Sequence, residues 1–130
     1  MTEEGIGAAI RRKEDFRFLV GRGRFIDDLD PPGLAHCFVQ RAPLAHARIV
    51  GLGTANALAA PGVLAVFTGA DMAADGIGPM RCMWPVTSAD GTAMNEPERW
   101  VLARGTARYQ GEPVAAVIAE TAHQAEAAAE

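Results

Sequence analysis

The chain of 130 residues has few aromatic residues and cysteines, and only one serine and one lysine. Aromatic residues make up 6% of it, so the core must be built mostly from Ala, Val, Leu and Ile. The two cysteines, Cys37 and Cys82, form no CxxC pair, which is typical of reduced thiols in a reducing compartment. The longest strongly apolar run, Val114–Ala119, is far too short to cross a bilayer, and the N-terminus lacks the features of a signal peptide. These absences predict a soluble, cytoplasmic protein with no membrane span.

An excess of positive charge is also missing, because the net charge is −4. The sequence therefore gives no electrostatic reason to expect a nucleic acid as a partner. The charge is unevenly spread: residues 1–24 carry six basic and four acidic side chains, whereas residues 25–130 carry six and twelve. Two interpretations of the basic N-terminal part stay open, namely a solvated arm and an arm that lies on an acidic neighbouring surface.

The side chains that usually carry catalysis or bind metals do not form a recognisable set. The histidines lie in different expected elements and share no ligand spacing. They are His36, His46 and His123. Ser88 lacks the glycine elbow of a hydrolase nucleophile, and Cys82 has no identifiable partner base. Asp27 and Asp28 are adjacent on an expected strand, so their carboxylates should point to opposite faces. We therefore predict no catalytic, metal-binding or cofactor-binding residue in this chain.

Hydrophobic periodicity and turn residues predict an N-terminal arm over 1–20, followed by short strands and two short helices. Strands are expected over 21–29, 34–39, 47–52, 63–67 and 113–119, with further short strands over 100–102 and 107–109. One helix, over 55–60, should be capped by Thr54, and the other should begin at Thr121. The strand over 34–39 is apolar on both faces, as in a strand that is covered on both sides.

Residues 69–99 do not fit this pattern. They contain four of the five methionines, Trp84, and repeated glycine and proline, without a sustained period. The Met and Trp content argues against plain disorder, because disordered segments lack such residues. We therefore expect a long irregular loop that packs on another surface.

The last helix has a start signal and no stop signal. Thr121 is followed three residues later by Gln124, and Ala122, Ala125 and Ala129 fall on one helical face. No Gly, Asn, Pro or basic last turn follows. The sequence is therefore interpreted as the front piece of a longer polypeptide, with a helix that is ordered at its start and frayed at its end.

Gly51–Asn56 offers a rival hypothesis, because it follows an expected strand, opens an expected helix, and precedes Asp71 by about twenty residues. This is the layout of a dinucleotide-binding turn. Two features argue against it. Asn56 replaces the third glycine, and the helix that must end at Pro61 is too short for a normal crossover.

Four segments of the chain, individually weak and jointly specific, resemble the start of the large subunit of the molybdenum hydroxylases. They are Arg12–Leu29, Arg41–Ile49, Pro61–Asp71 and Arg108–Thr121. The family includes xanthine dehydrogenase, aldehyde oxidase and the aerobic carbon monoxide dehydrogenase large chain. The resemblance implies an α+β fold, the small hammerhead domain of short strands, two short helices and one long irregular loop. This domain would span 21–130 and stop before its last strand.

The resemblance also implies a noncatalytic domain that supports the cofactor-bearing part of the enzyme and contacts partner subunits. The parent enzyme would oxidise a small molecule such as an aldehyde, purine, heterocycle or CO at molybdenum held by molybdopterin. Its partners would be the remainder of the large subunit and the iron–sulfur and flavin (FAD) subunits, and this segment itself would bind no cofactor. Without the last strand, a sheet edge would be unpaired and the chain could dimerise through it.

The family motifs imply structural roles for eight residues. They are Gly21, Gly23, Asp27, Asp28, His46, Gly111, Glu112 and Pro113. Gly111 permits an unusual turn and Pro113 fixes the entry to a strand. Glu112 is expected to pair with an arginine or to cap backbone amides. Two alternatives stay open, a nucleotide-binding enzyme domain that uses Gly51–Asn56 and a free-standing interaction module that is complete at Glu130.

Overall fold

The computed structural model describes residues 11–130, and the chain divides into two compact units, Met1–Pro32 and Gly33–Glu130. Residues 1–10 of the expected arm lie outside the described residues. The first unit contains α1 (Asp15–Leu19) and a single 3-10 turn, η1 (Ile26–Asp28). Neither element buries a side chain, so the described part of this unit has no hydrophobic core of its own.

The strand predicted over 21–29 is wrong, because η1 occupies its second half. Asp28 Oδ2 accepts a hydrogen bond from the backbone nitrogen of Phe25 at 2.8 Å. A carboxylate that binds an amide three residues earlier favours a tight turn over an extended strand. Asp27 and Asp28 therefore lie on a helical turn and not on opposite faces of a strand.

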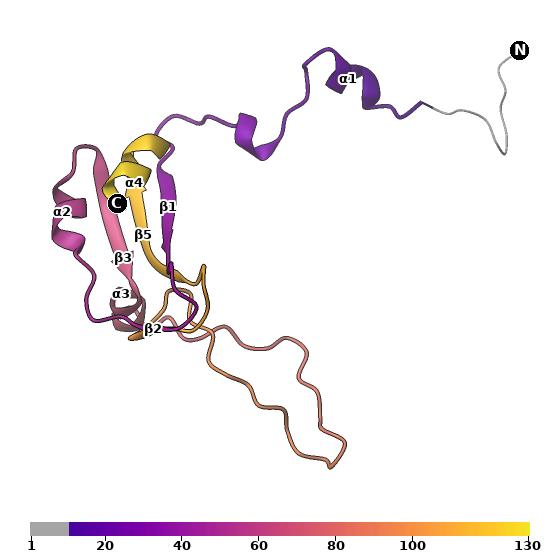
Figure 1. Cartoon of the computed structure of the whole chain (residues 1–130). Coiled ribbons are helices and arrows are strands. Elements are labelled where there is room, and N and C mark those ends of the chain that lie inside the picture. Colours follow the sequence, from indigo (N-terminus) through magenta and orange to yellow (C-terminus); the bar gives the residue numbers. More distant parts are fainter. Residues whose placement is uncertain (1–10) are drawn as a thin grey trace, which may run out of the picture. The chain divides into compact units, whose positions relative to one another are not determined.

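The second unit is built on a three-stranded antiparallel sheet in the order β1–β5–β3 (Figure 1). The strands are β1 (His36–Arg41), β3 (Val63–Thr68) and β5 (Pro113–Ala119). A separate two-stranded sheet pairs β2 (Ala47–Arg48) with β4 (Thr106–Ala107). β5 is the central strand, and its run is apolar on both faces. The predicted α+β fold is confirmed, and so are the predicted bounds of β5.

Helix α4 (Ala122–Ala128) follows β5 directly and packs against all three strands of the sheet. It begins where predicted, because Thr121 Oγ1 accepts a hydrogen bond from the backbone nitrogen of Gln124 at 3.2 Å. Ala125 is fully buried, as expected. Of the other two predicted positions, Ala129 is half-buried and Ala122 is exposed, and Ala128, which was not predicted, is half-buried as well.

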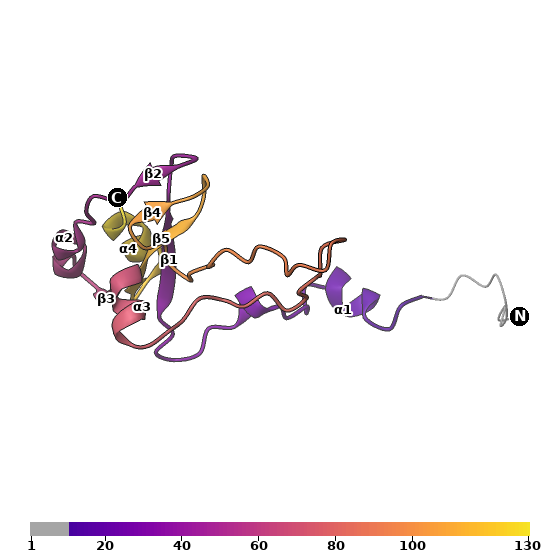
Figure 2. The same ribbon diagram turned by 90° about the horizontal axis from the view of Figure 1, so that it is seen from below.

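The region 69–99 is more ordered than predicted. It opens with α3 (Gly69–Ala74), a helix that was not predicted. Residues 80–99, here called the Met80–Arg99 hairpin, then form two arms that run side by side (Figure 1, Figure 2). The backbone nitrogen of Met80 donates to the Arg99 carbonyl oxygen at 2.8 Å, and that of Ser88 donates to the Thr92 carbonyl oxygen at 2.8 Å. The expected irregular loop is therefore a helix followed by an irregular hairpin.

The other predicted elements exist with shifted bounds. β1 begins two residues later than expected, and β2 is only two residues long. Helix α2 (Thr54–Ala59) is confirmed, but Thr54 lies inside it and Gly53 precedes it without a side-chain cap. Residues 100–102 form no strand. Residues 11–130 thus contain four α-helices where two were predicted, and none of them is long and apolar enough to span a membrane.

Candidate functional site

The segment 111–113 leads into β5 and is the best-defined of the predicted family-motif positions. Gly111 has a φ of 89°, a conformation that residues with a side chain rarely adopt. Its amide donates to the Ala42 carbonyl oxygen at 2.8 Å, and the Ala42 amide donates to the Glu112 carbonyl oxygen at 2.9 Å. Pro113 is the first residue of β5 and pairs with Arg41 where the register shifts. These hydrogen bonds hold the turn before β5 against the residue that follows β1.

Glu112 is the only buried charged side chain among the described residues, with 4% of its surface exposed. Its Oε2 accepts a hydrogen bond from the backbone nitrogen of Arg108, and its Oε1 lies 3.4 Å from Arg108 Nη1. The expectation that Glu112 pairs with an arginine or binds a backbone amide is confirmed in both forms. Arg108 is not among the eight predicted family-motif residues, although it lies only four positions before Glu112. Because both oxygens have partners, Glu112 stabilises the turn.

Gly21, Gly23, Asp27 and Asp28 belong to the first unit. Gly21 has a φ of 69°. A Cβ added to Gly23 would lie 2.9 Å from the ring of Phe18, which stacks on the ring of Phe25 with their centroids 5.6 Å apart. Gly23 therefore leaves room for this ring pair, and Asp28 holds the turn that follows it.

The histidines and cysteines do not gather into a site. His46 is exposed in the turn before β2, and Cys37 is exposed on β1. Cys82 lies in the Met80–Arg99 hairpin, where its backbone nitrogen donates to Glu96 Oε1 at 2.6 Å. Within residues 11–130, no group of three or more His, Cys, Asp or Glu side chains is placed to hold a metal ion.

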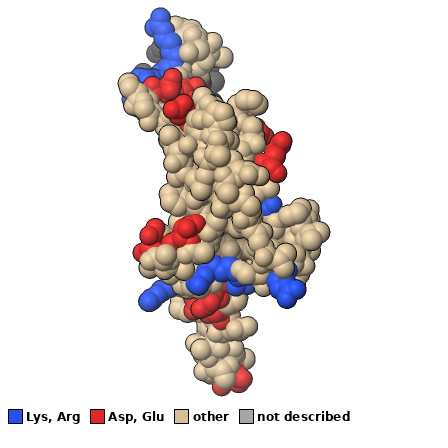
Figure 3. All heavy atoms as spheres, turned by 90° about the vertical axis from the view of Figure 1, so that its left-hand side faces the viewer, with Lys and Arg blue, Asp and Glu red and all other residues tan. Residues whose placement is uncertain are grey.

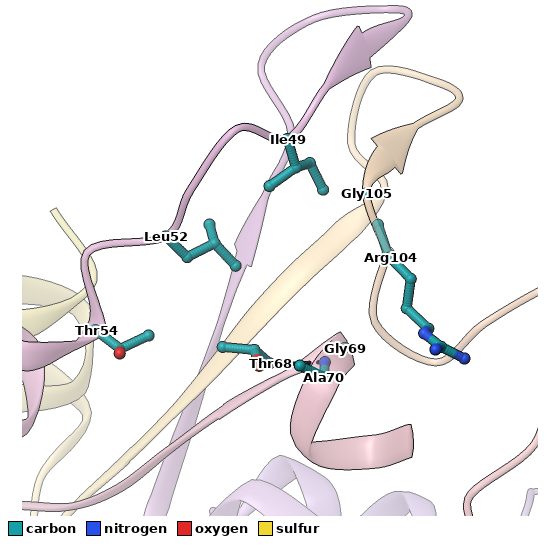
Figure 4. A pocket seen from close by; sticks show the side chains of 9 residues that line it. Ile49, Leu52, Thr54, Thr68, Gly69, Ala70, Arg104 and Gly105 are labelled. Atoms are coloured by element: carbon teal, nitrogen blue, oxygen red, sulfur yellow. Dashed lines mark hydrogen bonds between the residues drawn. The ribbon is translucent and has the colours of Figure 1, made fainter. Parts of the chain in front are cut away.

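An open cavity of about 640 Å³ lies between the N-terminus of α3, the segment after β2 and the segment before β4 (Figure 4). Ile49 and Leu52 point into it, whereas the side chain of Arg104 runs away from it. The Arg104 guanidinium carbon lies 4.5 Å from the centroid of the Trp100 ring. Thr68 Oγ1 is already engaged with Asp71 and with the amides that open α3.

This cavity does not fit molybdopterin, the cofactor that the family resemblance implies. A phosphate-bearing pterin needs several hydrogen-bond donors that converge on it. Here the Thr68 hydroxyl is engaged with Asp71, and the Arg104 guanidinium points away from the cavity over Trp100. Throughout the described part of the chain, no buried side-chain nitrogen or oxygen atom lacks a hydrogen-bond partner. No step of any reaction is therefore assigned to these residues.

The layout around Gly51–Asn56 also argues against a dinucleotide-binding turn. β2 ends at Arg48 and pairs only with β4, in an antiparallel arrangement. α2 has six residues and leads into β3, which belongs to the other sheet. A dinucleotide-binding crossover instead joins parallel strands of one sheet through a full helix.

Many large apolar side chains are exposed, and they are the clearest functional signal. Those with the highest exposure are Phe16, Leu19, Ile26, Val50, Met83 and Trp84. Figure 3 shows one face on which basic and acidic side chains lie in small separate clusters, with wide areas that carry neither. Where exposed apolar side chains form a contiguous surface, that surface is typical of a contact site.

The sequence comparison identifies the family. The model of the aldehyde oxidase and xanthine dehydrogenase a/b hammerhead domain matches residues 20–130. The chain belongs to this hammerhead family. The hammerhead domain is 39% identical over 127 residues to the nicotine 6-hydroxylase large subunit of Paenarthrobacter nicotinovorans, a match that covers 97% of this chain and 15% of that protein. It is 40% identical over 108 residues to the carbon monoxide dehydrogenase large chain of Hydrogenophaga pseudoflava, covering 83% of this chain and 12% of that one.

A solved structure agrees with these matches. Quinoline 2-oxidoreductase from Pseudomonas putida 86 superposes with a TM-score of 0.83 at 40% identity, over 95% of this chain and 15% of that one. The hammerhead domain is thus homologous to large subunits of molybdenum-dependent oxidoreductases, and it spans between 12% and 15% of the length of these three relatives.

Proposed function

We propose that this chain is a noncatalytic structural and subunit-contact domain of a molybdopterin-dependent large subunit. The observation that carries the proposal is the coverage of the matches: nearly all of this chain aligns with only 15% of a nicotine 6-hydroxylase large subunit. The chemistry of such an enzyme would therefore reside mainly in polypeptide that the match does not include. The contacts of Glu112 with the backbone nitrogen and the guanidinium of Arg108 support a structural role for the one buried charge of the described residues.

The parent enzyme would oxidise a small molecule such as an aldehyde, a purine, a heterocycle or CO. Molybdopterin would be bound by the rest of the large subunit, and the iron–sulfur and FAD groups would belong to partner subunits or domains. Relatives named as part of a complex support this view, since one is the gamma subunit of a 6-hydroxypseudooxynicotine dehydrogenase complex.

Two segments are the proposed contact surfaces. The first is the arm around α1 and η1, where Leu19 and Ile26 are exposed beside several arginines. The second is the Met80–Arg99 hairpin, where Met83 and Trp84 are 91% and 82% exposed. Its arms are held by hydrogen bonds before any partner binds, so docking would lose little conformational entropy there.

Complementation tests the proposal directly. The nicotine 6-hydroxylase large subunit of P. nicotinovorans is produced without the 127 residues that match, here called the shortened large subunit, together with this chain. The chain should co-purify with the shortened large subunit at equal stoichiometry. The chain alone should contain no molybdenum and should not oxidise an aldehyde or a purine. Failure to co-purify, or molybdenum bound by the chain alone, would overturn the proposal.

The two alternatives have tests of their own. Titration with NAD and FAD should give no binding, whereas micromolar binding would favour a nucleotide site at Gly51–Asn56. Sequencing the gene beyond codon 130 distinguishes a domain of a large subunit, which requires a reading frame that runs on for several hundred codons, from a free-standing module that stops there.

A further inference from the structure

One face of the three-stranded sheet is apolar and uncovered within the described structure. The strand register places six side chains on this face, which is here called the open sheet face. They are Cys37, Val39, Ala65, Phe67, Ala116 and Ile118. Paired residues of antiparallel strands point to the same side, so Val39 and Phe67 flank Ala116 on this face.

The opposite face is covered by α4. Ala115, Val117 and Ala119 of β5 point to that side and are buried, and Val117 is only 2% exposed. On the open sheet face, by contrast, Ala116 and Ile118 of β5 are only half-buried, and on the neighbouring strands Phe67 is 37% exposed and Cys37 is exposed. The two faces of one strand therefore differ in coverage although both are apolar.

An apolar face is unusual for a sheet that has water on one side. Antiparallel sheets with one solvated face normally alternate apolar with polar side chains. The open sheet face instead carries no charged, hydroxyl or amide side chain. The apolar character of both faces of the strand over 34–39 already predicts a strand covered on both sides, and α4 supplies only one of the two covers.

We infer that the open sheet face docks against the remainder of a large subunit of this family, through aliphatic and aromatic side chains of that polypeptide. The inference rests on the proposed function. The relatives carry more than five-sixths of their length outside the hammerhead segment, so the polypeptide needed for a second cover is present in them. A charged partner surface would be unfavourable, because its charged side chains would find no hydrogen-bonding partner on the open sheet face.

Cys37 provides a direct probe of this contact. In a Cys82→Ser variant, Cys37 carries the only thiol of this chain. The rate at which this thiol reacts with a maleimide is measured in the free chain and in the complex with the shortened large subunit. We expect labelling at Cys37 to slow by about tenfold or more in the complex, because the thiolate must be accessible to react. A matched control, Ala127→Cys in a Cys37→Ser/Cys82→Ser background, places the thiol on the exposed side of α4, where labelling should change little.

A substitution tests the same face by affinity. Phe67→Arg should weaken binding to the shortened large subunit by about tenfold or more. Leu58→Arg, on the exposed side of α2, should leave binding unchanged. Circular dichroism checks that both variants fold, and Cys37 labelling decides the question if Phe67→Arg does not.

The outcomes separate the two hypotheses. Co-purification with Cys37 still fully reactive would overturn the inference and leave the proposed function standing. Absence of co-purification would overturn the proposed function and the inference with it. A concentration-dependent dimer of the free chain that protects Cys37 would assign the open sheet face to a second copy and would also overturn the inference.

Discussion

Glu112 is a buried carboxylate, as many catalytic residues are, but its contacts give it a structural role. Its carboxylate binds the backbone nitrogen and the guanidinium of Arg108, whose side chain is 40% exposed. In a Glu112→Ala variant the guanidinium can turn to water, but the Arg108 amide loses its acceptor. We expect the free energy of unfolding to fall by about 1–3 kcal/mol, measured by urea denaturation. Glu126→Ala, at an exposed position of α4, is the control and should change it by less than about 0.5 kcal/mol. Equal losses in the two variants would contradict the assigned role.

Gly69 is required by a close approach of two segments. A Cβ at this position would lie 2.5 Å from the Ala103 carbonyl oxygen and 2.9 Å from that of Leu102. Gly69→Ala must therefore push α3 away from the 102–104 segment, at an expected loss of about 1–3 kcal/mol of unfolding free energy. Gly53→Ala is the matched control, because nothing lies within 4 Å of its added Cβ. Thermal unfolding of the two variants checks the prediction, and an unchanged midpoint for Gly69→Ala would refute it.

Residue roles could be predicted only where they depend on local sequence. The kind of partner that Glu112 has, an arginine and a backbone amide, was expected, and the partner residue lies only four positions earlier. The requirement for Gly69 could not be predicted, because it depends on contact with residues more than thirty positions away. The face of α4 was predicted correctly at Ala125 and Ala129 and wrongly at Ala122, because the position of the sheet decides which end of the alanine face is covered.

Among the elements, α3 depends on a capping box that makes its start sensitive to acid. Asp71 Oδ2 accepts hydrogen bonds from Thr68 Oγ1 at 2.6 Å and from the Thr68 backbone nitrogen at 2.7 Å. These bonds, the hydroxyl's first, hold the pKa of the Asp71 carboxyl below its usual value. Because the folded pKa is lowered, the contribution of the box is complete above the unfolded pKa and is lost as the pH falls through the folded one.

Thr68→Val removes the hydroxyl donor and should raise the pKa of Asp71 towards the usual range. Titration of the carboxyl carbons by NMR measures this shift. Asp90 is an internal control, because its pKa is lowered by the hydroxyl and then the amide of Thr92, in a different segment. A pKa of Asp71 that is unchanged by the substitution would show that the capping box does not set it.

Elements were predictable where the pattern is strong and local. β5 is an unbroken apolar run between a proline and a capping threonine, and both of its bounds were predicted correctly. α3 was missed because Gly69 stands at its first position and the helix has only six residues. The Met80–Arg99 hairpin was taken for an irregular loop because its arms are joined by scattered bonds, some of them to side chains, and show no alternation of apolar and polar residues.

The resemblance to the family, rather than periodicity, correctly predicted the fold of the molecule. Four short segments spread over the chain carried it, and together they span both units. The open sheet face could not be located in this way, because it is assembled from three strands that are distant in sequence. It becomes visible only when the register aligns Cys37 with Ile118 and Phe67 with Ala116.

The buried core predicts that the isolated chain is only marginally stable. Nine hydrophobic residues are buried among those described, and six of them are alanines, which bury little apolar area each. We expect a free energy of unfolding below about 5 kcal/mol in urea, at or under the lower end for natural domains. The exposed apolar surface should also bind the dye ANS. With the shortened large subunit present, mass action should move the urea transition of this chain to higher concentration and reduce dye binding. A free chain more stable than about 10 kcal/mol would mean that its own core suffices, and the apolar surfaces would then need an explanation other than docking.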